Sequence, residues 1–252
     1  MNDWHLFNAD CTDAVARVVQ TSANPVIVTD PPFNVGYRYD CYEDRKGVGE
    51  YYAWLGGILS LCPCVVIHYP EALYRLAFQL GTPPERVVAW TYNSNTPRQH
   101  RDVAFFRIAP DFSGLGEYKN PTDKRVAALM EKGRKPIGYD WIYHDQIKNV
   151  SGEKFAHPCQ MPLAVMSYIV ATLPPSATII DPFAGTGTTL VAAKRGGRAC
   201  VGFEISPQYY AIAKSRMEND QPLFDLRPRE CGAALGEGSQ PSGTSSPRVS
   251  PR

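Results

Sequence analysis

The run that decides the fold is Asp181-Pro182-Phe183-Ala184-Gly185-Thr186-Gly187-Thr188-Thr189. It follows the apolar stretch 178–180, a predicted strand, and it opens a predicted helix over 188–195. Two glycines one residue apart allow a tight turn and a close approach of the backbone to a ligand. The free N–H groups at the start of the helix can bind an anionic group. We therefore expect a ligand site where this strand ends.

An acidic residue favours a nucleoside cofactor as that ligand. Glu204 ends the next predicted strand, 199–203, where its carboxylate can accept hydrogen bonds from ribose hydroxyls. A Walker A loop is excluded because no Gly-Lys-Ser/Thr sequence follows the turn. A dinucleotide fingerprint fits poorly because Leu190 stands where a third glycine is expected. Gly-x-Gly alone is equally consistent with an ordinary strand–helix turn, so the cofactor prediction depends on Glu204 and on the Asp-Pro-Phe lead-in.

A second turn, Asp30-Pro31-Pro32-Phe33, ends the β-branched stretch 26–29. Its two prolines fix φ on consecutive residues, so the turn is stiff, and ligands of open α/β sheets bind at this carboxyl edge. The carboxylate and a proline carbonyl can accept the two hydrogens of an exocyclic amino group. Phe33 can stack on the ring that carries that group. The turn therefore suits a planar base, although Asp-Pro-Pro by itself favours an ordinary turn.

Short apolar strands alternate with helical stretches along most of the chain. The predicted strands cover 5–8, 26–29, 65–68, 87–90, 103–106, 178–180 and 199–203, and the predicted helices cover 50–61, 71–80, 162–173, 188–195 and 206–217. Continuous apolar runs suit strands that are buried on both faces of a parallel sheet. The pattern predicts an α/β, doubly wound sheet in one domain over 1–218. From 236 to 252, eleven of the seventeen residues are Gly, Ser or Pro, so we expect a disordered tail over 219–252.

The composition sets few limits on function. The 252 residues are 44% hydrophobic and carry a net charge of +1, which neither requires nor excludes a nucleic-acid partner. No run approaches the length of a membrane span, and the first residues lack a secretory signal, so we expect a cytoplasmic protein, bacterial or from a virus in a bacterial host. The seven cysteines predict reduced thiols. We predict no metal site, because Cys62-Pro63-Cys64 is spaced too closely for a zinc knuckle.

Together the two turns resemble the catalytic and cofactor motifs of the DNA amino-methyltransferases that use S-adenosylmethionine. The catalytic motif precedes the cofactor motif here, as in the β group of that family. Two further elements fit the same order: His157-Pro158-Cys159-Gln160-Met161-Pro162 is similar to the group's His-Pro-Thr-Gln-Lys-Pro element, and Asn8-Ala9-Asp10-Cys11 to its Gly-Asp-Cys element. The resemblance covers residues 4 to about 218. It implies a Rossmann-like, seven-stranded, mostly parallel sheet with permuted motif order, in which the two turns end neighbouring central strands.

The resemblance also implies roles for individual residues. The cofactor S-adenosylmethionine is expected to contact Asp10 and Cys11 at its adenine, Glu204 at its ribose, and Phe183, Gly185, Gly187 and Thr188 at its methionine part, beside Asp181 and under His157 and Gln160. The target amino group is expected at Asp30, Pro31, Pro32 and Phe33, where it attacks the sulfonium methyl directly. Asp-Pro-Pro-aromatic turns resemble the adenine-N6 enzymes, since the cytosine-N4 enzymes more often carry serine in place of Asp30. Cys159 and Met161 depart from the family's usual threonine and lysine, and we expect activity to survive both changes.

Double-stranded DNA is the expected partner. The stretch 93–155 fits the strand–helix pattern poorly and matches the family's variable target-recognition region. Between 119 and 135 it carries six basic residues against two acidic ones, which suits phosphate contacts, although a solvated charged loop is the alternative. The candidate DNA contacts are Tyr39, Arg45 and Lys46 in a loop that could close over flipped DNA, and Lys124 and Arg125 in the basic segment.

Several other readings stay open at this point. The target could be cytosine N4, an RNA base, a protein amide or a small molecule, or the protein could bind nucleic acid on this fold without turnover. The basic segment and the motif order favour DNA over the others. Homodimers are common in the resembling group, and nothing in the sequence identifies a restriction partner or the target site.

Overall fold

The computed structural model describes residues 3–39, 41–118, 120–147, 152, 154–155, 157 and 159–220. The predicted tail therefore lies outside the described residues from 221 onward. The strands are β1 (Trp4–Phe7), β2 (Pro25–Thr29), β3 (Cys64–His68), β4 (Arg86–Thr91), β5 (His100–Phe106), β6 (Trp141–Tyr143), β7 (Thr178–Asp181) and β8 (Cys200–Phe203). The helices are the 3-10 turn η1 (Cys11–Asp13) and the α-helices α1 (Val15–Thr21), α2 (Val48–Leu59), α3 (Pro70–Leu80), α4 (Lys124–Glu131), α5 (Leu163–Ala171), α6 (Thr188–Arg195) and α7 (Pro207–Asn219).

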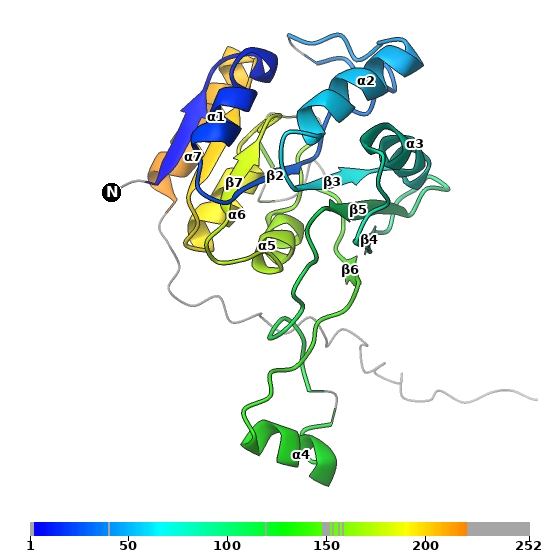
Figure 1. The fold of residues 1–252 in the computed structure, drawn as a ribbon, viewed down its shortest axis with the longest axis vertical. Coiled ribbons are helices and arrows are strands. Elements are labelled where there is room, and N and C mark those ends of the chain that lie inside the picture. The colour runs from blue at the N-terminus through cyan, green and yellow to red at the C-terminus, as the bar shows by residue number, and fades with distance from the viewer. Residues whose placement is uncertain are drawn as a thin grey trace, which may run out of the picture. The chain divides into compact units, whose positions relative to one another are not determined.

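All the described strands belong to one sheet of order β1-β8-β7-β2-β3-β5-β4-β6 (Figure 1). Every neighbouring pair is parallel except those of β5, which runs antiparallel to both β3 and β4. The α/β, mostly parallel sheet is therefore confirmed. The strand count of seven was one too low, because β6 adds an edge strand of three residues. Trp141-Ile142-Tyr143 is a run of only three residues, shorter than the runs by which strands are recognised in a sequence.

Two apolar cores lie on the two faces of the sheet, because successive side chains of a strand point to opposite faces. Val26 and Val28 of β2 pack in one core with α5, α6 and Met217 of α7. Ile27, between them, packs in the other core with α1, α2 and α3. Helices thus cover both faces, as expected of a doubly wound sheet.

The two motif turns lie side by side at the carboxyl edge of this sheet. β2 pairs with β7 in parallel, with Ile27 opposite Ile180, so Asp30 and Asp181 follow neighbouring strands. β7 pairs on its other side with β8, which Glu204 follows. The strand order reverses between β7 and β2, and ligands of open α/β sheets bind at such a switch point.

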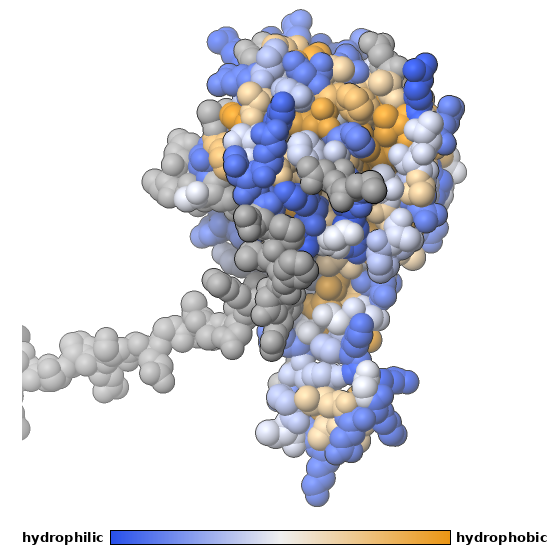
Figure 2. All heavy atoms as spheres, turned by 90° about the vertical axis from the view of Figure 1, so that its left-hand side faces the viewer, coloured by the Kyte–Doolittle hydropathy of each residue, from blue (hydrophilic) through white to orange (hydrophobic). Residues whose placement is uncertain are grey.

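The predicted target-recognition region 93–155 is only partly separate from the sheet. β5 lies inside the sheet and β6 at its edge, which leaves 107–140 as the part that departs from it. Figure 1 shows α4 of this segment away from the sheet, joined to it by two chain segments. Asp123 caps α4 by accepting from the N–H of Arg125, and no residue of α4 is buried. Figure 2 shows hydrophilic side chains around the rim of the lobe that α4 and the segment 107–140 form.

In the part of the chain that the structure describes, no helix is both long and apolar enough to cross a membrane. The same residues contain no group of His, Cys, Asp and Glu side chains that could hold a metal ion.

Candidate active site

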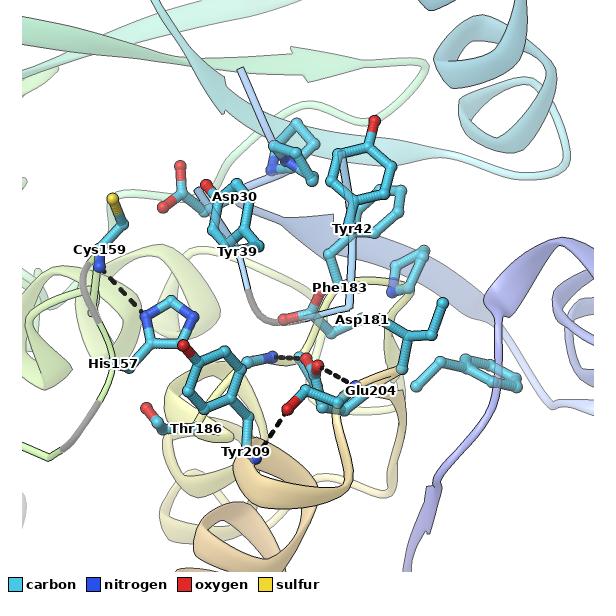
Figure 3. Close-up of a pocket in the computed structure, with 18 of the residues that line it drawn as sticks. Asp30, Tyr39, Tyr42, His157, Cys159, Asp181, Phe183, Thr186, Glu204 and Tyr209 are labelled. Carbon is cyan, nitrogen blue, oxygen red and sulfur yellow. Dashed lines mark hydrogen bonds between the residues drawn. The ribbon is translucent and has the colours of Figure 1, made fainter. Parts of the chain in front are cut away.

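A cavity of about 280 Å³ opens where β1, β2, β7 and β8 end. Its lining includes every predicted cofactor residue except Gly187, and all four residues of the Asp30 turn: Asp10, Cys11, Asp30, Pro31, Pro32, Phe33, His157, Gln160, Asp181, Phe183, Gly185, Thr188 and Glu204. Figure 3 shows Asp30 and Glu204 on opposite sides of Asp181 in this pocket. One hollow therefore joins the two turns that the sequence placed at neighbouring strand ends.

The carboxylate of Glu204 holds the glycine turn in shape. Its Oε2 accepts from the Gly185 N–H at 2.8 Å and its Oε1 from the Ser206 N–H at 2.8 Å (Figure 3). Burial raises the pKa of Glu204 to about 7, against the lowering effect of those two N–H groups. The predicted ribose acceptor is thus also a brace between the β7 turn and the start of α7.

Asp181 ties the glycine turn to the strand that carries the catalytic motif. Its Oδ1 accepts from the hydroxyl of Thr29 at 2.7 Å and from the N–H of Phe183 at 3.0 Å. The side chain is buried, and burial raises its pKa. The two motifs are therefore connected directly, by a hydrogen bond between β2 and β7.

Asp30 is a buried carboxylate with free hydrogen-bonding capacity. Its side chain is 15% exposed, and its Oδ2 lies 3.8 Å from Nη1 of Arg101, too far for a hydrogen bond. Its Oδ1 is fully buried and has no hydrogen-bond partner among the described residues. Burial raises the pKa of Asp30 to about 7, although Arg101 lowers it. A buried acceptor without a donor is costly, and the residue that carries it lines the cavity.

Comparison with known proteins identifies the family. A family model for DNA methylases matches residues 84–215. The type II methyltransferase M.ScaI of Streptomyces caespitosus is 44% identical over 88% of this chain and 84% of its own length. The chain belongs to the DNA methylase family. Its resemblance to the DNA amino-methyltransferases is thereby confirmed.

One further sequence match and two solved structures are less similar to the chain. The type II methyltransferase M.HpaI of Haemophilus parainfluenzae is 24% identical over 85% of this chain and 75% of its own. The crystal structure of an M1.HpyAVI–SAM complex superposes with a TM-score of 0.56 at 18% identity, covering 85% of this chain and 99% of the other. The cytosine-N4-specific PvuII DNA methyltransferase superposes with a TM-score of 0.58 at 16% identity, covering 85% and 88%. These two structures show the fold.

His157 lies over the glycine turn of the methylase. A Cβ at Gly185 would come within 3.4 Å of its Nε2, and its ring meets Tyr209 edge-on at 4.5 Å. Its Nδ1 accepts from the N–H of Cys159 at 3.2 Å, and burial lowers its pKa to about 4, so the ring is neutral with its proton on Nε2. Gln160 accepts from the N–H of Phe155 at 2.8 Å. Pro158 of the same element lies outside the described residues.

The N-terminal element reaches the same cavity. Asp10 accepts from the Thr12 N–H at 2.8 Å and so caps η1, while Cys11 beside it is buried. Burial raises the pKa of Cys11 to about 12, which keeps it a thiol. Trp54 of α2 also lines the cavity and packs against Phe183 at 5.3 Å.

The candidate DNA contacts are not gathered in one place. Tyr39 lines the cavity, whereas Arg45, Lys46, Lys124 and Arg125 do not. The loop after the catalytic turn is tied together by buried Asp44, whose carboxylate accepts from the N–H groups of Asn34, Val35 and Tyr37 at 2.7–3.1 Å. Arg125 on α4 has a side chain that is 92% exposed.

Sequence reasoning missed the residues that support the Asp30 turn from behind. His68, at the end of β3, stacks on Phe33 with ring centroids 4.3 Å apart. Its Nδ1 accepts from the Tyr69 N–H, so its Nε2–H donates to the hydroxyl of Tyr51 at 2.9 Å. Tyr51 in turn donates to the Pro32 carbonyl at 2.6 Å. Among the described residues, none donates to the Pro31 carbonyl, so the free proline acceptor is that of Pro31. No local sequence pattern marked His68 or Tyr51 as supports of this turn.

Tyr51→Phe should loosen this turn without emptying the core. The variant leaves the Pro32 carbonyl and the His68 Nε2–H without partners, and an unpaired buried polar group costs about 1–3 kcal/mol. We expect Tm to fall by several degrees and kcat to fall by about 3- to 10-fold, since the turn is held less firmly. Tyr52→Phe is the matched control, because no hydrogen bond of its hydroxyl is found among the described residues. Equal effects of both variants would contradict the role of Tyr51.

Gly187 does not line the cavity, but its backbone conformation and its close contact with α7 both require glycine. It adopts φ +78° before α6, and a Cβ would come within 3.0 Å of the Ala213 Cβ of α7. We expect Gly187→Ala to lower the free energy of unfolding by about 2–3 kcal/mol, measured by denaturant titration. Gly197→Ala, at φ +69° with open space around it, carries only the backbone strain of about 1–2 kcal/mol. If the two variants lose the same stability, the contact with α7 has no effect.

Proposed function

We propose that this methylase transfers the methyl group of S-adenosylmethionine to the exocyclic amino group of a base in DNA. The observation that carries the proposal is the unpartnered Oδ1 of Asp30, buried in the same cavity as the glycine turn. An amino group supplies the donor that this oxygen lacks. The free Pro31 carbonyl is a second acceptor on the same stiff turn.

The residues around the cavity fit the cofactor. Gly185 adopts φ +54°, a left-handed conformation that favours glycine, and it lines the cavity. Aromatic rings of Trp54 and Phe183 line the same cavity as the carboxylates of Asp10 and Glu204. We assign Asp10 and Cys11 to the adenine, Glu204 to the ribose, and Phe183, Gly185 and Thr188 to the methionine part, with His157 and Gln160 over it. When bound, S-adenosylmethionine supplies an electrophilic methyl group on its sulfonium sulfur.

The chain's own residues orient and activate the base. Asp30 and Pro31 accept the amino hydrogens, which directs the nitrogen lone pair out of the ring plane toward the methyl carbon. Acceptors fixed before the reaction need no reorganisation as charge develops. As the nitrogen–carbon bond forms and the carbon–sulfur bond breaks, the nitrogen loses a proton, and the Asp30 carboxylate is placed to take it. The base must leave the duplex to reach this turn.

Adenine N6 is our first assignment, because the turn begins with Asp30 rather than serine. Cytosine N4 is the second, because the PvuII enzyme with a similar fold is cytosine-N4-specific. The named relatives are type II methyltransferases, and we propose a site-specific modification role on double-stranded DNA for this chain. A homodimer stays a prediction, as do the domain over 1–218 and the tail over 219–252.

The test supplies S-adenosylmethionine labelled on its methyl group to the purified protein with DNA, RNA and protein substrates in parallel. We expect label in DNA and none above background in RNA or protein. Label in RNA or protein instead would show that the substrate is not DNA. Cofactor binding without transfer to any of the three would identify a nucleic-acid-binding protein that lacks turnover.

The lobe that carries α4 is the proposed DNA contact outside the cavity. Replacing Lys124 and Arg125 together by alanine should weaken DNA binding at all sequences. The loss of two phosphate contacts would make the negative slope of log K against log salt shallower by about 1.8. Fluorescence anisotropy over a salt series measures this, with Lys214→Ala on α7 as a control exposed cation. If affinity and slope are both unchanged, α4 is not part of the DNA surface.

A further inference from the structure

Arg101 is a buried cation that the proposed reaction does not use. It lies on β5, and its side chain is 14% exposed. Its guanidinium carbon lies over the rings of Phe33, Trp90 and Tyr69, at 4.8, 5.4 and 5.9 Å from their centroids. The side chain lines the same cavity as Asp30. Such burial holds the guanidinium in a defined place beside the catalytic turn.

Arg101 and Asp30 face each other without forming a closed ion pair. A carboxylate and a guanidinium in contact normally come within 2.7–2.9 Å, yet these two stay 3.8 Å apart at their nearest atoms. Among the described residues, Oδ1 of Asp30 has no donor and Nε of Arg101 has no acceptor, and both atoms are buried. Two facing residues that line the cavity thus carry one unused acceptor and one unused donor.

This pair matches only some bases. Adenine carries a donor, the N6 amino group, next to an acceptor, the ring nitrogen N1. Cytosine carries its N4 amino group next to the ring nitrogen N3. Guanine and thymine present the reverse order at the same edge, a carbonyl oxygen next to a ring N–H. Flipped bases are read through hydrogen bonds to this edge.

We propose that Arg101 is a specificity-determining residue, which donates from Nε to the ring nitrogen beside the target amino group while Asp30 accepts from that amino group. Guanine and thymine would set a carbonyl against Asp30 and an N–H against Arg101, so both are rejected. The proposal rests on the proposed function, and it applies to adenine and to cytosine alike.

The test uses a duplex that carries the methylated site, mapped beforehand in methylated plasmid DNA. A second duplex replaces the ring nitrogen of the target base by C–H, as 1-deazaadenine or 3-deazacytosine. We expect kcat/KM of the unaltered enzyme to fall about 10- to 100-fold on the deaza duplex, the loss of one hydrogen bond to a charged group. Arg101→Met should lose a similar factor on the normal duplex and nothing further on the deaza duplex.

Arg98→Met is the matched control, because Arg98 also lies over Tyr69, at 3.9 Å, but does not line the cavity. It should keep the discrimination of the unaltered enzyme. If the unaltered enzyme methylates both duplexes equally well, or if Arg101→Met keeps the full discrimination, the role of Arg101 is overturned while the proposed function stands. If it methylates no unmodified DNA at all, the proposed function fails and this inference with it. The comparison on the unaltered enzyme decides the matter even if Arg101→Met does not fold.

Discussion

Asp30→Ala is expected to lower kcat for methyl transfer by about 100- to 1,000-fold, the usual effect of removing one preorganised hydrogen-bonding group. None of the described residues donates to the buried Oδ1 of Asp30, so removing the carboxylate removes the acceptor that we propose orients the amino nitrogen. Cofactor affinity should stay within about 3-fold, because the glycine turn is braced by Glu204 and not by Asp30. Single-turnover kinetics and calorimetric titration with S-adenosylmethionine separate the two. A variant that keeps its kcat would contradict the assignment.

The raised pKa of Asp30 adds a pH dependence and a stability effect. Burial raises this pKa to about 7, and only the ionised form offers both oxygens as acceptors, so activity should fall as the pH drops through about 7. Asp30→Asn keeps one acceptor oxygen but cannot titrate, so its activity should not fall as the pH drops through about 7. A carboxyl whose pKa is raised in the folded state destabilises the fold as the pH rises from its unfolded pKa, about 3.9, to its folded pKa, about 7. Above that pH the destabilisation stays constant. We therefore expect Asp30→Asn to raise Tm at pH 8 relative to the unaltered enzyme, and to change it little at pH 3.

Glu204→Ala should lower affinity for S-adenosylmethionine by about 10- to 100-fold, equivalent to about 1.4–2.8 kcal/mol. The variant removes a carboxylate at the proposed ribose position and leaves the N–H groups of Gly185 and Ser206 without their present partner. Calorimetric titration measures the affinity.

Two controls separate the parts of this effect. Glu204→Gln keeps one acceptor oxygen, so its loss should be intermediate. Glu218→Ala on α7 removes an exposed carboxylate outside the cavity and should leave the affinity unchanged. A cofactor affinity of Glu204→Ala equal to that of the unaltered enzyme would show that the β7 turn needs neither the brace nor the ribose contact.

Most of the sheet could be predicted from the sequence because its strands β2, β3, β7 and β8 are buried on both faces. Such strands appear as continuous apolar runs that end at proline or aspartate, as at Asp30 and Asp181. The edge strand β6 was missed because its three residues are too short a run to indicate a strand. α4 is only eight residues long and none of them is buried, so it takes no part in the apolar cores whose pattern the sequence shows. α1 is short and follows η1 directly, which leaves little pattern to detect.

The cavity could be predicted where chain-adjacent motifs form it, and not where distant segments meet. The turns at Asp30 and Asp181 carry their own proline and glycine signals. Arg101, Tyr51 and His68 act on the Asp30 turn from three other elements, β5, α2 and β3. No local pattern marks them, since their importance comes from contacts across the sheet. Glu204 could be predicted from its place at a strand end, but its hydrogen bond to the Gly185 N–H could not, because that bond joins two different strand ends.

The central claim is that the Asp30 turn presents the amino group of a DNA base to the methyl group of the cofactor. The most direct measurement incubates the protein with unmodified DNA and S-adenosylmethionine, digests the DNA and identifies the methylated nucleosides by mass spectrometry, with Asp30→Ala in parallel. We predict an amino-methylated nucleoside, N6-methyladenine first and N4-methylcytosine second, that disappears with Asp30→Ala. 5-Methylcytosine, or no methylated nucleoside from a protein that binds the cofactor, would contradict it.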